Sequence, residues 1–140
     1  MTDFLMIAFL AVIVLVGGLI LFVISHGRKG ARTLDVDRYR TSWMTIEQQL
    51  VKGEEASCHL VVLNADKLLD QALKQRNFKG DTMGERMKSA RDVWSNANNV
   101  WAAHKLRNRI AHETDVKVGY DNARRALAAY KQALKDVRAI

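Results

Sequence analysis

Proline is absent from this chain of 140 residues, and cysteine occurs once, as Cys58. Proline breaks helices because its ring clashes with the preceding turn and its nitrogen carries no hydrogen, so its absence leaves helix possible throughout. Alanine, leucine, lysine and arginine, which are strong helix formers, are abundant instead. Nothing in the sequence indicates a strand-rich fold, and we expect an all-α protein.

A single cysteine also excludes a disulfide within the chain. Cys58 lies among small and apolar residues, which is typical of a buried, reduced thiol in a cytoplasmic domain. Metal-site spacing is missing as well. His104 and His112 lie eight residues apart, and no cysteine or carboxylate completes a set of ligands with them. We therefore expect neither a metal ion nor another cofactor.

Charged and strongly polar side chains are missing from Phe4 to Ile24, a run of 21 residues. At about 1.5 Å per residue, a helix of this length covers roughly 30 Å, the thickness of the hydrocarbon core of a bilayer. A cleaved signal peptide would have a basic start, a shorter apolar core and a small-residue cleavage site. Because the chain starts with Met1-Thr2-Asp3, we predict that residues 1–26 form an uncleaved transmembrane anchor.

Basic residues follow the apolar run, whereas only Asp3 precedes it. This asymmetry predicts that the N-terminus lies outside and that the C-terminal part is cytoplasmic. We expect residues 27–33 to form a basic juxtamembrane linker. Its basic residues would lie at the membrane surface, where the attraction of anionic lipid contributes about 1 kcal/mol of binding free energy for each Lys or Arg. They are Arg28, Lys29 and Arg32.

Residues 34–140 are enough for one compact domain. Apolar residues recur at spacings of three and four, which predicts an antiparallel bundle of four to five helices. We expect helices near residues 36–50 and 54–76, then a third that opens with the capping box Thr82-Met83-Gly84-Glu85 and runs through Trp94. After a break at residues 95–99, a fourth should cover 100–113, and a fifth should follow Asp115.

The fourth predicted helix has an apolar face and a polar row. Its apolar face should pack in the core, and it comprises Val100, Ala103, Leu106 and Ile110. His104, Asn108 and His112 recur every four residues and form the polar row, with Trp101 near its start. The row presents hydrogen-bonding groups along one line of the helix.

Arg107 and Asn108 stand just before this row ends, and four residues separate Arg107 from His112. This segment resembles the Arg-x4-6-His signature of HEPN domains, which are small all-helical modules, many of them metal-independent ribonucleases. The residue after the arginine is usually polar in that family, as Asn108 is here. The resemblance implies a HEPN-like domain over residues 34–140, RNA as a substrate and a homodimer. Attachment to a membrane helix departs from many such domains.

The resemblance also implies a role for each motif residue. His112 would act as the general acid or base, Arg107 would clamp the phosphate, and Asn108 would orient His112 or the substrate. His104 and Trp101 are possible accessory residues outside the family motif. Arg107 is turned by about 140° from His112 on an ideal helix, so a shared cleft requires a second copy of the helix.

Two other interpretations stay open. The motif residues can be a solvated helix face with a histidine near the favourable C-terminal end of the dipole. The domain can instead be a non-catalytic, membrane-anchored module for dimerisation or for binding an unknown protein partner, with its fifth helix as the surface. The net charge of +7, which becomes +8 without Asp3, favours phosphate partners and the anionic inner leaflet alike.

Overall fold

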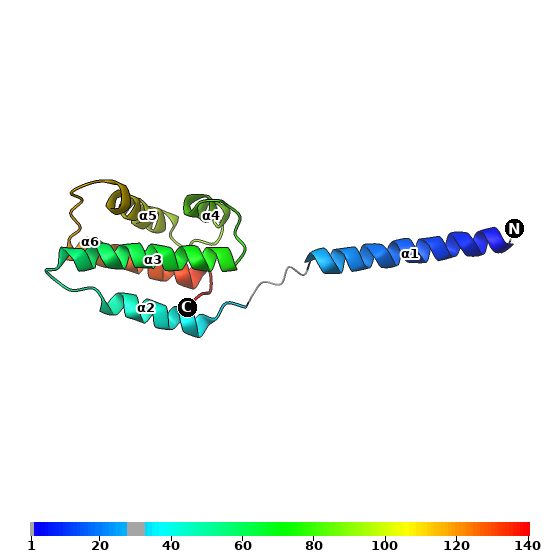
Figure 1. Cartoon of the computed structure of the whole chain (residues 1–140), viewed down its shortest axis with the longest axis horizontal. Coiled ribbons are helices and arrows are strands. Elements are labelled where there is room, and N and C mark those ends of the chain that lie inside the picture. The colour runs from blue at the N-terminus through cyan, green and yellow to red at the C-terminus, as the bar shows by residue number, and fades with distance from the viewer. Residues whose placement is uncertain (1, 28–32) are drawn as a thin grey trace. The chain divides into compact units, whose positions relative to one another are not determined.

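The computed structural model describes residues 2–27 and 33–140. All of its regular elements are helices, which confirms the expected all-α fold for the described residues (Figure 1). They are α1 (Thr2–Gly27), α2 (Val36–Gln48), α3 (Glu55–Gln75), α4 (Met83–Ser89), α5 (Ala97–His112) and α6 (Tyr120–Asp136). The chain divides into two units, of which the first holds α1 and the second holds α2–α6. Arg28, Lys29 and Arg32, expected at the membrane surface, lie outside the described residues.

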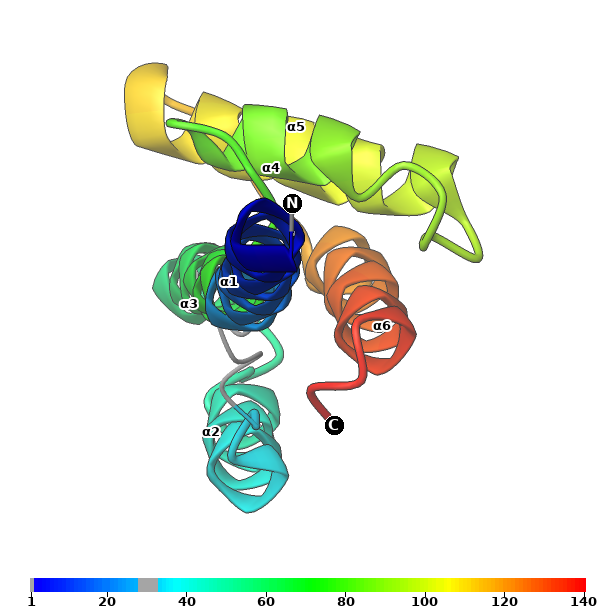
Figure 2. The ribbon, with the colours of Figure 1, turned by 90° about the vertical axis from the view of Figure 1, so that its right-hand side faces the viewer.

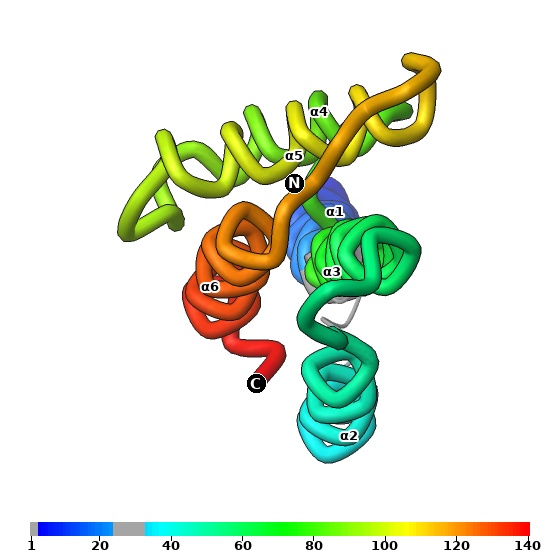
Figure 3. The backbone as a smooth tube through the Cα atoms, turned by 90° about the vertical axis from the view of Figure 1, so that its left-hand side faces the viewer, coloured from blue at the N-terminus to red at the C-terminus, as the bar shows by residue number. Residues whose placement is uncertain are grey.

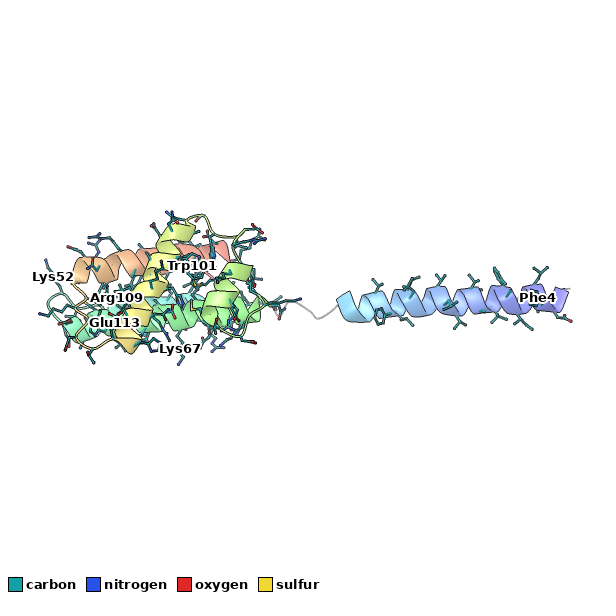
Figure 4. All side chains as sticks on the ribbon, turned by 90° about the horizontal axis from the view of Figure 1, so that it is seen from above. Phe4, Lys52, Lys67, Trp101, Arg109 and Glu113 are labelled. Atoms are coloured by element: carbon teal, nitrogen blue, oxygen red, sulfur yellow. The ribbon has the colours of Figure 1, made fainter. Side chains whose placement is uncertain are left out.

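Helix α1 is apolar on all its sides. Its large hydrophobic side chains are exposed from Phe4, at 76%, to Val23, at 61%, and they project all round the helix in Figure 4. A helix of this kind needs an apolar environment on every face. By length and composition, the segment Asp3–Val23 is able to cross a membrane.

The second unit is built around α3, which contacts α2, α4, α5 and α6. Figures 2 and 3 show α2, α3 and α6 nearly end-on, with α5 lying across α3 and α6 on the side away from α2. Arg76, just after α3, donates from Nε to the carbonyl oxygen of Val137, just after α6, at 2.9 Å. This bond joins the C-terminal ends of α3 and α6, so these two helices run in the same direction.

Side-chain caps fix several helix ends. The carboxylate of Asp35 accepts a hydrogen bond from the backbone nitrogen of Arg38 and starts α2. The predicted capping box of α4 is present, because Thr82 and Glu85 each bond to the other's backbone nitrogen. Helix α4 ends at Ser89, however, so Trp94 lies in the non-helical segment between α4 and α5 rather than in the predicted helix.

Helix α5 begins three residues before the predicted start. The side chain of Asn96 accepts a hydrogen bond from the backbone nitrogen of Asn99 at 3.2 Å, and this cap draws residues 97–99 into the helix. The predicted break at residues 95–99 is therefore longer than the observed one, because residues 97–99 belong to the helix. Val100 and Ala103 are buried, as the predicted core face requires.

The core lies entirely within the second unit, between Leu34 and Ala139. Its largest fully buried side chains include Tyr130, Leu69, Leu73 and Met87. Cys58 is free and 2% exposed, which confirms the predicted buried thiol. Because α1 contributes nothing to this core, we expect residues 33–140 to fold without the anchor.

Candidate functional site

A buried carboxylate joins three helices of the second unit. Asp66 of α3 is 3% exposed. Its Oδ1 accepts a hydrogen bond from the Tyr130 hydroxyl of α6 at 2.9 Å and lies 2.8 Å from Nδ1 of His104 on α5. Burial of a carboxylate costs several kcal/mol unless charged or hydrogen-bonding groups compensate it, and here two side chains share one of its oxygens.

The other oxygen of Asp66 faces the motif arginine. Nε of Arg107 lies 3.2 Å from Oδ2, but its N–H is not aligned with that oxygen, so the contact is an ion pair rather than a hydrogen bond. The Arg107 side chain is 35% exposed and therefore spans the distance from the buried carboxylate to the surface. Its Nη1 donates to Oδ1 of Asn108 at 3.0 Å.

Asn108 closes the arrangement. Its Nδ2 lies 3.3 Å from Nε2 of His104, so four side chains form a closed cycle of polar contacts. We call this cycle the Asp66 ring, and its members are Asp66, His104, Asn108 and Arg107. Trp101 packs its ring edge against His104, with centroids 6.0 Å apart, and Figure 4 shows its place on α5.

Tyr130 is a permanent donor to this ring. Burial raises the pKa of the Tyr130 hydroxyl far above its usual value, and the neighbouring charge and hydrogen bond of Asp66 raise the pKa further. The phenol therefore stays protonated at any physiological pH. It supplies a hydrogen bond to Asp66 without a competing charge.

His112 lies at the C-terminal end of α5 and is exposed. None of the described residues lies within hydrogen-bonding distance of its ring. Nearby, Arg109 pairs with Glu113 at 3.3 Å, and Figure 4 shows these two side chains together. The predicted polar row thus runs from the buried His104 to the exposed His112, and only its first two members, His104 and Asn108, belong to the Asp66 ring.

The sequence motif did not reveal Asp66 or Tyr130. Asp66 lies 38 residues before His104 and 64 before Tyr130, so no local spacing connects them. One signal was present: Asp66 is a charged residue within the broad apolar arc of the second predicted helix, beside Ala65 and Leu69. A carboxylate on a buried face requires partners from other helices.

Helix α5 is also the cationic element of the domain. Lys105, Arg107 and Arg109 give it positive charge, and no aspartate or glutamate occurs from Ala97 to His112. Each of α2, α3, α4 and α6 contains acidic residues. A helix without acidic side chains offers phosphate groups an approach free of repulsion.

A groove of about 460 Å³ lies between α5 and α6, away from the Asp66 ring. Its floor is largely alanine, and polar side chains such as Asn99 and Gln132 stand around it. The alanines that line it are Ala102, Ala103, Ala126, Ala128, Ala129 and Ala133.

No protein-family model, curated protein or solved structure matches this chain. The interpretation of the site therefore depends on its residues and their geometry.

Proposed function

We propose that this protein is a membrane-anchored, HEPN-like endoribonuclease that cleaves RNA without a metal ion. The observation that carries the proposal is the Asp66 ring, which holds Arg107 and Asn108 side by side and leaves His112 exposed on the same helix. Buried polar clusters of this kind are expensive and gather at functional sites. The ring fixes Arg107 through Asp66, and the exposed imidazole of His112 is open to a substrate.

Arg107 is suited to clamp a phosphate. A guanidinium has five N–H donors. In the Asp66 ring Nε forms only an ion pair, one hydrogen of Nη1 is donated to Asn108, and no described residue accepts from Nη2. The free donors can bind a phosphate and stabilise the additional negative charge of the pentavalent transition state.

His112 is the proposed general acid or base. Its exposed ring can take the proton of a ribose 2′-hydroxyl or give a proton to the leaving 5′-oxygen. Attack of the 2′-oxygen on phosphorus then breaks the bond to the 5′-oxygen and leaves a 2′,3′-cyclic phosphate. In this scheme Asn108 positions Arg107 by accepting a hydrogen bond from it, and Trp101 packs against the ring of His104.

A homodimer supplies the geometry that one copy lacks. His112 and Arg107 point about 140° apart on a single helix, so they do not meet on one phosphate within the same chain. Two-fold packing of α5 on its symmetry mate would bring His112 of each copy toward Arg107 of the other. The three basic residues of α5, a helix with no aspartate or glutamate of its own, support RNA as the molecule that enters between them.

The anchor would confine this activity to a membrane. Helix α1 has the length and composition for a span. The basic residues that follow it in the sequence, Arg28, Lys29 and Arg32, place the domain on the cytoplasmic side and bind anionic lipid.

The test is cleavage of mixed RNA by the fragment Thr33–Ile140 in excess chelator. We expect His112→Ala and Arg107→Ala each to lower the cleavage rate by about 10²- to 10³-fold, since each removes a group that acts in the transition state. His59→Ala is the matched control, because His59 lies on α3 outside the site and forms an ion pair with Glu55, at 3.7 Å. If all three variants cleaved RNA at the rate of the parent fragment, the assignment would be contradicted.

The α5–α6 groove favours a second function. A concave, alanine-lined surface can receive an apolar helix face, as a non-catalytic dimerisation or interaction module requires. Ala129→Arg would place a charge in this groove, whose lining includes none of the four residues of the Asp66 ring. Two results together would favour the module over the nuclease. The folded parent fragment would cleave no RNA, and it would self-associate whereas the Ala129→Arg variant would not.

A further inference from the structure

The hydrogen bonds of the Asp66 ring have only one consistent direction. The Nη1 group of Arg107 carries hydrogens and no lone pair, so the atom of Asn108 that faces it must be the oxygen. The amide nitrogen of Asn108 then faces Nε2 of His104 and donates to it. Nε2 must therefore be free of hydrogen, and Nδ1 must carry the hydrogen that it donates to Asp66.

We propose that His104 is a positioning residue that orients Asn108, and through it Arg107, by means of an imidazole whose single hydrogen is on Nδ1. The ring contacts stand independently of any activity, and only the consequence for RNA rests on the function proposed above. His104 touches no substrate in this scheme. It decides which end of the Asn108 amide faces the arginine.

The opposite protonation states disrupt the ring. If Nε2 carries a hydrogen, alone or together with Nδ1, it faces the hydrogens of the Asn108 amide nitrogen. The amide must then rotate to present its oxygen to His104, and its nitrogen turns toward Nη1 of Arg107. Two donors now oppose each other there, and the guanidinium loses its contact with Asn108. Arg107 is left with the ion pair to Asp66 alone.

The surroundings of His104 offer few substitutes for these contacts. The ring is 7% exposed, so water has little access to it. The ionisable groups around it are Asp66 of α3, Arg107 of α5 and Tyr130 of α6, the last bonded to the same carboxylate oxygen. From α4, Gly84 approaches, where an added Cβ would lie 4.0 Å from Nε2. Trp101 forms a T-shaped ring contact with His104, and its indole nitrogen is a donor only.

The first test determines where the hydrogen sits. The full chain in detergent micelles, labelled with ¹⁵N at histidine only, gives separate signals for the two nitrogens of each ring. His104 is assigned by loss of its signals in His104→Gln. We expect the hydrogen of His104 on Nδ1 and none on Nε2, which is the minority form of a free imidazole. A hydrogen on Nε2, or on both nitrogens, would overturn the proposal.

The second test separates the two contacts of His104. The amide of a glutamine reaches the place of Nε2 and can accept from Asn108, whereas the amide of an asparagine reaches the place of Nδ1 and can only donate to Asp66. Binding of the full chain to a 2′-O-methyl RNA, which cannot be cleaved through the 2′-oxygen, is measured by fluorescence anisotropy. Loss of one charge-assisted contact corresponds to about tenfold in affinity.

We expect His104→Gln to bind within about threefold of the parent chain, and His104→Asn to lose about tenfold, as Asn108→Ala does. Equal losses for the Gln and Asn variants would overturn a role through Asn108 and leave His104 a packing residue. If the parent chain binds no RNA, the proposed function fails. The position of the hydrogen on His104 then decides the present proposal by itself.

Discussion

Asp66 shows at the scale of one residue how this domain handles a buried charge. Its carboxylate receives a hydrogen bond or an ion pair from His104, Arg107 and Tyr130, which come from two other helices. Each contact offsets part of the hydration free energy that the carboxylate loses on burial. The same contacts also fix the arginine of the motif, so one residue links the stability of the fold to the geometry of the site.

Replacing Asp66 tests this link. Asp66→Asn leaves Arg107 without its anion, and we expect a loss of about 3 kcal/mol in the free energy of unfolding, at the low end for a broken buried pair because Arg107 is partly exposed. Tyr130→Phe removes one hydrogen bond and should cost about 1 kcal/mol. Urea unfolding of Thr33–Ile140 followed by circular dichroism measures both. Asp92→Asn, at an exposed position, is the control, and an equal cost there would refute the role of Asp66.

Asp70 predicts how stability depends on pH. Burial alone would raise the pKa of the Asp70 carboxyl, but hydrogen bonds from Arg86, at 2.7 Å, and from Lys74 outweigh burial and hold that pKa below its usual value. A lowered pKa in the folded state contributes stability that is present above the unfolded value of about 3.9, and this stability is lost as the pH falls from that value through the lower folded pKa.

Asp70→Asn removes this dependence. Between pH 7 and pH 3, the free energy of unfolding should fall less steeply for the variant than for the parent fragment, as urea titrations at each pH would show. Parallel curves for the two proteins would mean that Asp70 contributes nothing to the acid response.

At the scale of elements, local chemistry sets where helices start, and loop geometry sets how they connect. Side chains cap α2, α4 and α5, at Asp35, Thr82 and Asn96. Such caps can be recognised in a sequence, as the Thr82 box was, but many polar residues have the same potential. Asn96 stands in a cluster of polar residues, and the sequence alone did not distinguish it from its neighbours.

Two glycines beside α4 should respond in opposite ways to alanine. In Gly84→Ala the new Cβ meets atoms no closer than 4.0 Å, inside a helix that alanine favours, so we expect a gain of about 0.5–1 kcal/mol in stability. In Gly80→Ala the Cβ would lie 2.6 Å from the backbone nitrogen of Arg86, at a φ of +150°, so we expect a loss of more than about 2 kcal/mol. Thermal unfolding of the two variants gives the comparison, and shifts of the same sign would be inconsistent with this packing.

At the scale of the whole molecule, the chain consists of a helix that needs an apolar environment and a domain that does not. Every residue of the packed core comes from the second unit. Helix α1 exposes apolar side chains around its whole circumference. The apolar surface of α1 suits a different environment from that of the helical domain. We therefore expect substitutions in one unit to leave the stability of the other unaltered.

A charge in the middle of α1 tests this separation. Ile13→Arg should oppose insertion by about 2.5–3.5 kcal/mol and lower the fraction of the chain that resists alkaline extraction from membranes, whereas Ile13→Leu should not. The unfolding of the helical domain should be the same in both variants. Full resistance of the arginine variant to extraction would argue against a simple span.

The sequence by itself determined which segments form the main helices, whereas the end of α4 and the start of α5 differ from the prediction. The unbroken apolar run of α1 indicates a helix suited to an apolar environment. Apolar residues at helical spacing predicted α3 to within one residue at each end, because burial of a helix face depends on local periodicity. Local pattern also made Arg107, Asn108 and His112 the candidate site residues, since their spacing is short.

Only the tertiary structure decided which of these polar residues lie together. It buried His104, exposed His112 and brought Asp66 and Tyr130 to the motif from helices far along the chain. The reason is physical: how α5 crosses α3 and α6 results from the packing of many side chains at once, and no spacing within a single helix records it.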